Sequence, residues 1–116
     1  MKDFKKLKTW QKGIKLVIDI YKTSRIFPKE ELYGLTSQMR RSAISIPSNI
    51  AEGAGRNSDK DFNRFLDISL GSSFELETQV IIAKELEFLS DIEFQDLTEK
   101  IQEEQKMITG LQRSLK

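Results

Sequence analysis

The sequence predicts an all-α protein folded as an antiparallel up-down-up-down four-helix bundle, in a single domain that spans residues 1–116. Apolar residues recur every three or four positions in four segments, which places them along one face of a helix. The breaks between the segments are short, and no segment alternates as a strand does. With 116 residues and 38% hydrophobic side chains, the chain can bury one core. Four amphipathic helices with short connections pack most economically as a bundle.

The first helix is expected over about residues 8–26, because its apolar side chains follow the helical repeat. It ends where Pro28 follows Phe27, since the residue before a proline avoids the α conformation. Additional apolar residues widen the stripe, so this helix is expected to contact two partners. The stripe consists of Leu7, Trp10, Ile14, Val17 and Tyr21, and the residues that widen it are Leu16, Ile18 and Ile20.

The second helix is expected to begin near residues 29–35 and to run to about Gly53, whose glycine is typical of a helix stop. Pro47 lies in its middle and is expected to kink it. Small polar residues along one side allow a close neighbour, and their hydroxyls can bond to carbonyls that the proline leaves free. We therefore interpret this segment as a structural seam with the third helix, in which Arg41 pairs with a glutamate. The seam residues are Arg41, Ser45, Pro47, Asn49, Glu52, Gly53, Glu75 and Glu77.

The third helix is expected to begin after a cap at Ser58 or Asp59 and to end near Leu89. The fourth begins after a cap at Ser90 or Asp91. The core stripe of the third helix consists of Phe62, Leu66, Ser69, Ser73, Leu76, Val80 and Ala83, and that of the fourth consists of Phe94, Leu97, Ile101, Ile108, Leu111 and Leu115.

A second apolar stripe follows the third helix beside its core stripe. Either a broad buried face includes these residues, or they form a subunit interface, because monomers rarely expose a long apolar ridge. We favour self-association. The stripe consists of Leu70, Phe74, Ile81 and Phe88.

The composition argues against most enzyme classes. The chain has no histidine and no cysteine, which removes the commonest general base, thiolate nucleophiles and the usual transition-metal ligands. We therefore expect no enzyme activity, no cofactor and no metal. A Mg²⁺ site built from Glu52, Glu75 and Glu77 is a weaker alternative. No segment approaches the roughly 18 apolar residues of a membrane span, so we expect a cytoplasmic protein without membrane contact.

The net charge of +1 conceals an uneven distribution of charged residues. Residues 1–58 carry 12 Lys/Arg and 5 Asp/Glu, whereas residues 59–116 carry 7 and 13. The basic half could bind phosphates of RNA or DNA, with Trp10 available for stacking, or it could face the acidic half within the bundle or across a subunit contact. The candidate nucleic-acid residues are Lys5, Lys6, Lys8, Lys12, Lys15, Lys22, Arg25, Arg40 and Arg56.

Two blocks of the sequence resemble the bacterial four-helix-bundle family named for proteins encoded in 23S rRNA intervening sequences. The first block is residues 38–53, with Arg-Ser-Ala-Ile-Ser-Ile-Pro-Ser-Asn at its centre, and the second is residues 61–79, with Gly71-Ser72 and Glu75-Leu76-Glu77. Trp10-Gln11 fits the opening helix of the family. The resemblance implies a homopentamer, as in the related accessory variability determinant of diversity-generating retroelements, whose basic surface is associated with nucleic acid.

These expectations lead to a non-enzymatic homo-oligomer that assists a nucleic-acid or nucleoprotein process through a basic surface. The alternative is a protein–protein interaction scaffold that binds no nucleic acid, in which the basic half docks an acidic protein. A carboxylate-metal enzyme is the third and weakest hypothesis.

Overall fold

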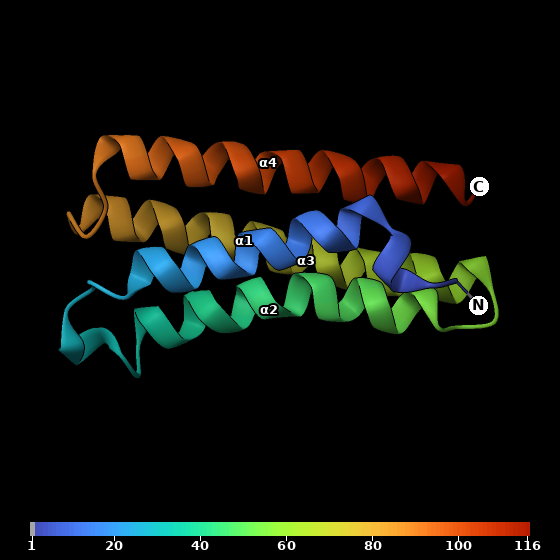
Figure 1. Ribbon diagram of the computed structural model, residues 1–116, viewed down its shortest axis with the longest axis horizontal. Helices are drawn as coiled ribbons and strands as arrows, with labels where there is room; N and C mark the ends of the chain where they lie inside the picture. Colours follow the sequence, from blue (N-terminus) through green and yellow to red (C-terminus); the bar gives the residue numbers. More distant parts are fainter. Residues whose placement is uncertain (1) are drawn as a thin grey trace.

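Four α-helices run along the long axis of the computed structural model, which describes residues 2–116 and measures 43 × 24 × 20 Å (Figure 1). Each helix contacts the next in sequence, and α4 also contacts α1, so the four axes form a closed square. The predicted all-α four-helix bundle is confirmed. No helix of residues 2–116 combines the length and hydrophobicity that a membrane crossing requires. The helices are α1 (Lys8–Ser24), α2 (Leu35–Ala54), α3 (Asp59–Glu85) and α4 (Asp91–Ser114), with 3₁₀ turns η1 (Phe4–Lys6) and η2 (Lys29–Glu31).

Serine side chains begin both α3 and α4. The Ser58 hydroxyl accepts a hydrogen bond from the Asp61 N–H at 3.1 Å, which satisfies a donor that the first turn leaves free. At α4, Ser90 accepts from the Glu93 N–H, while the Glu93 carboxylate accepts from the Ser90 N–H, which completes a capping box. The sequence allowed either serine or aspartate as the N-cap of each helix, and in the structure serine is the N-cap of both.

The third helix ends at Glu85, earlier than the predicted end near Leu89. Glu87 adopts a left-handed backbone conformation with φ of 65°, and the Phe88 N–H donates to the Ala83 carbonyl at 2.9 Å. This is the hydrogen-bond pattern of a Schellman motif. Glycine usually occupies the left-handed position of the motif, so the sequence carried no signal for this helix end.

The buried face of α1 differs from the predicted stripe. Ile14 is 37% exposed and Ile18 is 48% exposed, whereas Gly13 is buried among the core-facing residues. Small and polar residues form much of the buried line and bring α1 close to its neighbours. The helix is therefore rotated about its axis away from the orientation that the hydropathy pattern predicts. α1 contacts two helices, α2 and α4, as expected. Its apolar side chains that face neither helix form a stripe on the outside of the bundle. The buried line of α1 consists of Thr9, Gly13, Leu16, Ile20 and Ser24.

Helices α2 and α3 make the most extensive contact in the bundle. The Ser45 and Ser72 hydroxyls are 2.8 Å apart, and the Ser69 hydroxyl donates to the Ile46 carbonyl at 2.9 Å. The small side chains of the two helices therefore meet across a polar seam. α2 continues through buried Pro47 as one helix.

Gly53 lies inside α2 and is buried, so its role differs from the predicted helix stop. A Cβ at Gly53 would lie 2.7 Å from the Phe65 Cβ and 3.2 Å from the Phe62 carbonyl oxygen. The first separation is too short for two carbon atoms, and the second is tighter than most contacts of a Cβ atom. The absence of a side chain at Gly53 is what lets α3 approach α2 at this end of the bundle.

Candidate nucleic-acid and assembly surfaces

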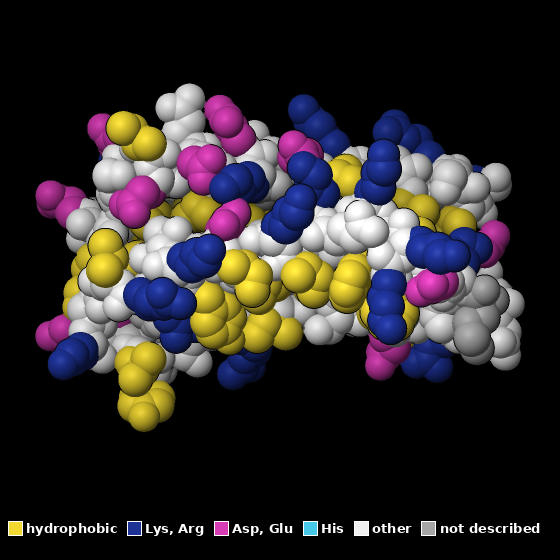
Figure 2. All heavy atoms as spheres, in the orientation of Figure 1, with side chains coloured by type: hydrophobic (Ala, Val, Ile, Leu, Met, Phe, Trp, Pro, Cys, Tyr) yellow, Lys and Arg dark blue, Asp and Glu magenta, His cyan; other side chains and the backbone are white. Residues whose placement is uncertain are grey.

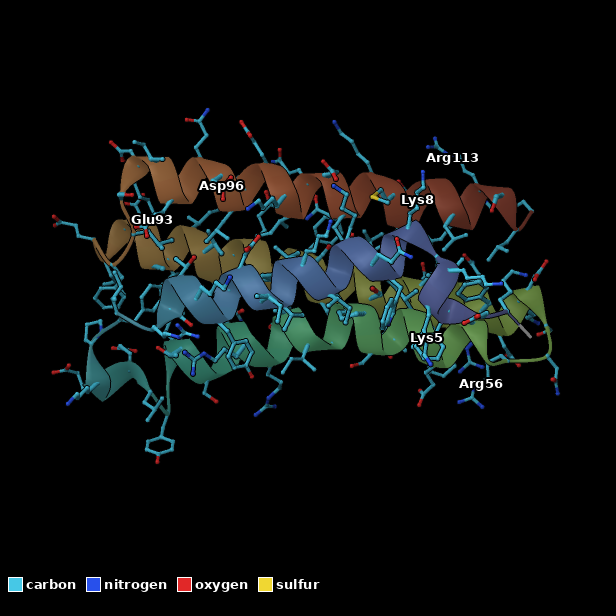
Figure 3. The ribbon with its side chains drawn as sticks, viewed as in Figure 1. Lys5, Lys8, Arg56, Glu93, Asp96 and Arg113 are labelled. Atoms are coloured by element: carbon cyan, nitrogen blue, oxygen red, sulfur yellow. The ribbon has the colours of Figure 1, made fainter. Side chains whose placement is uncertain are left out.

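Charged side chains are segregated along the long axis of the bundle. Lys5, Lys8 and Arg113 lie at or near the end that holds both chain termini, whereas Glu93 and Asp96 lie toward the other end (Figure 3). Residues 84–99 carry six Asp/Glu and one Lys, which makes the α3–α4 connection at that end acidic.

The basic end combines both extremities of the chain because the helices are antiparallel. Residues 2–8 carry four lysines and one aspartate, and residues 105–116 carry Lys106, Arg113 and Lys116 with no acidic residue. The cations of residues 105–116 belong to the acidic half of the sequence, so the division into halves does not reveal that they lie beside the N-terminal lysines. We use the name basic end for residues 2–8 together with residues 105–116.

Some of the predicted nucleic-acid residues already have partners within the bundle. Lys12 forms an ion pair with Glu103 on α4 at 3.1 Å. The Arg40 guanidinium donates to the Ser24 hydroxyl at 3.0 Å and lies over the Tyr21 ring. These contacts make Lys12 and Arg40 poor candidates for phosphate binding.

Arg56 and Lys5 are exposed but also have neighbours. Arg56 stacks over the Phe65 ring, with its guanidinium 4.7 Å from the ring centroid, and pairs with Glu52 at 3.9 Å. The Lys5 ammonium lies 5.8 Å from the Phe4 ring centroid. The remaining predicted cations form no ion pair within residues 2–116. They are Lys6, Lys8, Lys15, Lys22 and Arg25.

The bundle also contains contacts of the kind expected if the basic half faces the acidic half. Lys12 pairs with Glu103, and Lys2 pairs with Asp59 at 3.8 Å, so two lysines of residues 1–58 face carboxylates of residues 59–116. The pair of Lys100 with Asp19 at 2.8 Å also joins α1 to α4, but with the charges of the two halves reversed. Trp10 is half-buried and packs edge-on against Phe4, with ring centroids 5.3 Å apart, so it packs within the protomer.

The predicted pairing of Arg41 with a glutamate of α3 is wrong. Arg41 is exposed and forms no ion pair with any of residues 2–116. The Glu77 carboxylate instead accepts hydrogen bonds from the Gln102 and Gln105 amides of α4, at 3.2 and 2.8 Å. α3 therefore turns Glu77 toward α4, away from α2. Asn49, by contrast, lies in the seam and donates to the Ser45 carbonyl at 2.8 Å.

Two apolar faces lie on opposite sides of the square of helices. The first, which we call the α1/α2 face, forms an apolar patch over these two helices (Figure 2), and Ile14 and Ile44 of this patch line a shallow hollow of about 280 Å³. The second, which we call the α3/α4 face, borders grooves between these two helices. The α1/α2 face consists of Ile14, Ile18, Tyr21 and Ile44, and the α3/α4 face consists of Phe74 and Ile81, each between 36% and 52% exposed.

The four residues of the predicted interface stripe are not equally exposed. Phe74 is 52% exposed and Ile81 is 46% exposed. Leu70 and Phe88 are half-buried and pack against the core, and the Phe88 ring lies 5.5 Å from the Phe27 ring. Of the stripe, Phe74 and Ile81 present the most apolar surface to a partner.

Glu104 is a buried carboxyl group that the sequence pattern did not identify. It is 1% exposed, and neither of its oxygens has a hydrogen-bond partner among residues 2–116. Burial, followed by the nearby negative charge of Glu103, raises the pKa of Glu104 from 4.5 to about 8, against a smaller lowering by Lys12. The sequence did contain a sign of this burial: Ile101 and Ile108 are seven residues apart, and the helical repeat places residue 104 on the same buried face.

Two of the three glutamates of the alternative Mg²⁺ site, Glu52 and Glu77, have separate partners. Glu52 pairs with Arg56, and Glu77 bonds to glutamines of α4. Within residues 2–116, no three acidic side chains are arranged to hold a metal ion.

Comparisons with known proteins agree with this architecture. The family described as 23S rRNA-intervening sequence protein matches residues 5–110. A crystal structure from Bacteroides thetaiotaomicron VPI-5482, described as a protein with unknown function from the S23 ribosomal protein family, superposes with a TM-score of 0.81. The match covers 90% of this chain and 97% of that chain at 21% identity, so it supports the fold. No curated protein sequence matches the chain significantly.

Proposed function

Because the chain belongs to the 23S rRNA-intervening sequence protein family, we propose that it is a non-enzymatic homo-oligomer that assists a nucleic-acid or nucleoprotein process. The observation that carries this proposal is the basic end, where the cations of both chain extremities gather and whose two segments contain one acidic residue, Asp3. Lysine and arginine side chains bind the phosphate backbone without reading base sequence. The basic end is therefore suited to non-specific contact with RNA or DNA.

Self-assembly would strengthen this contact by grouping several basic ends. The α1/α2 face and the α3/α4 face differ in composition and lie on opposite sides of the protomer. A contact between two different faces generates a ring when its rotation closes. The number of five protomers rests on the resemblance to pentameric relatives. A ring multiplies a weak phosphate contact by the number of its subunits.

The test of nucleic-acid binding is fluorescence anisotropy with labelled double-stranded RNA, single-stranded RNA and duplex DNA across a range of salt concentrations. We expect binding at about 50 mM salt that weakens steeply as salt rises, because displaced counterions drive it. The triple variant K5E/K8E/R113E should abolish the binding. A matched triple variant, K22E/R25E/K29E, changes the same charge at the opposite end and should bind more nearly like the wild type.

Two results would contradict a nucleic-acid role. One is no binding at low salt, and the other is binding that salt does not weaken. Equal losses in the two triple variants would show instead that overall charge, and not the basic end, controls binding.

The acidic end supports the second candidate, a protein-interaction scaffold without nucleic-acid binding. Residues 84–99 offer six carboxylates, of which Asp91 pairs with Lys84 and Asp96 with Lys100. Of the other four, Glu93 caps the start of α4, whereas Glu85, Glu87 and Glu99 are exposed and form no ion pair within residues 2–116. A purified basic partner that still binds after nuclease treatment, and that a charge reversal at exposed Glu85 releases, would favour the scaffold.

A further inference from the structure

The carboxyl group of Glu104 lies where α1, α2 and α4 converge. Its Oε2 is 3.1 Å from the position that a Cβ on Gly13 of α1 would occupy, and the same position is 3.3 Å from the Cβ of Pro47 on α2. Any side chain at Gly13 would press on the carboxyl group. The missing side chain is therefore what makes room for Glu104 within the core.

No charge within the core compensates this carboxyl group. Glu104 is the only ionisable side chain among the buried residues of the described chain, so α2 and α3 present it with no buried charge. The nearest charged groups are Lys12 on α1 and Glu103 on α4, which pair with each other at 3.1 Å and are about half exposed. A negative charge at Glu104 would thus be unpaired, and unpaired buried charges are strongly unfavourable.

Water can reach Glu104 most readily between α1 and α4. These two helices contact each other less than any other neighbouring pair of α-helices. A groove of about 480 Å³ runs along the outside of their junction and is lined by Lys12, Leu16 and Glu103, among others. The ion pairs Lys12–Glu103 and Asp19–Lys100 span the junction and are partly exposed. Opening this junction therefore breaks less helix–helix contact than opening any other.

We propose that Glu104 is a proton-controlled latch for the junction of α1 and α4. The neutral acid lets the two helices close over Gly13, and the ionised acid separates them far enough to admit water. One consequence rests on the proposed function: α1 carries most of the α1/α2 face, so opening the junction weakens assembly.

The first test follows the proton directly. In protein labelled with ¹³C at glutamate carboxyl carbons, the Glu104 resonance should titrate near pH 8. Glu99 of α4 is exposed and serves as the surface carboxyl group for comparison. Titration of Glu104 near 4.5 would overturn the latch. Because this measurement uses the unaltered protein, its outcome does not depend on whether a variant folds.

The second test follows the junction by hydrogen exchange of residues 8–24, corrected for the intrinsic effect of pH. From pH 6 to pH 9 we expect at least a tenfold loss of protection in the wild type and in the control E99Q. The neutral isostere E104Q should show no pH-dependent loss. Equal pH-dependent losses in E104Q and the wild type would overturn the latch.

Light scattering over the same pH range separates the latch from the assembly. A mass that falls between pH 6 and pH 9 in the wild type but not in E104Q supports both proposals. If the protein is monomeric at every pH, but Glu104 titrates near pH 8 and the loss of exchange protection depends on Glu104, the result would refute the assembly and support the latch.

Discussion

Replacing Gly53 with alanine is expected to destabilise the protein, although alanine is the better helix former. The new Cβ would lie 2.7 Å from the Phe65 Cβ, 2.9 Å from the Phe62 Cδ1 and 3.2 Å from the Phe62 carbonyl oxygen. Two of these atoms move only with the backbone of α3. Comfortable carbon contacts are about 3.5 to 4.0 Å, so α2 and α3 must separate by close to 1 Å.

The magnitude follows from two opposing terms. Overpacking of this kind costs about 1 to 3 kcal/mol, and the exchange of glycine for alanine within a helix returns about 1 kcal/mol. We expect a net loss of up to about 2 kcal/mol, or a fall in Tm of up to about 8 °C. Urea unfolding followed by circular dichroism, at a fixed protomer concentration, measures this loss.

Gly71→Ala is the matched control for Gly53→Ala. Gly71 is exposed within α3, and no atom lies within 4 Å of the position of its added Cβ. This change should stabilise the protein by up to about 1 kcal/mol through helix propensity alone. If Gly53→Ala were as stabilising as Gly71→Ala, the close approach of α2 and α3 at Gly53 would be refuted.

Three further predictions concern charge and assembly. Because the folded-state pKa of Glu104 is about 8, above its ordinary 4.5, the folded state binds more protons, and stability should fall as pH rises from 4.5 to 8. The slope approaches about 1.4 kcal/mol per pH unit, and chemical denaturation of E104Q should lack this part of it. The double variant Phe74→Ser/Ile81→Ser should lower the mass measured by light scattering and keep its helical circular dichroism, whereas Ile26→Ser, at a 75% exposed residue outside both faces, should not. An unchanged mass in the double variant would place the interface elsewhere. Arg41→Ala should change stability by less than about 0.5 kcal/mol, since Arg41 is exposed and unpaired among residues 2–116, and a larger loss would reveal a role for Arg41 in assembly.

The sequence was sufficient for the fold because hydropathy and turn residues agree along the chain. Each of the four helices begins within a few residues of the predicted point, and Ser58 and Ser90 are caps that the pattern identified. The end of α3 was missed because Glu87 takes a conformation that usually requires glycine. The conformational preference of glutamate disagrees with the backbone conformation at this residue, and a single sequence conveys only such preferences.

The surfaces were harder to predict, because they depend on how helices rotate and on which ends meet. The hydropathy pattern placed Ile14 and Tyr21 in the core, but buried Gly13 turns that side of α1 outward. The basic end joins Lys8 to Arg113, which are far apart in sequence and adjacent only in an antiparallel bundle. Glu104 was missed because hydropathy assigns a glutamate to the surface, and only the helical repeat places it in the core.

Assembly of the protomer into a ring through its two apolar faces is the proposal that most needs a direct test. Size-exclusion chromatography coupled to light scattering, at near-neutral pH and moderate salt, measures the mass of the assembly. We expect a mass about five times that of the 13.4 kDa protomer. A mass of one protomer over the whole accessible concentration range would contradict the ring.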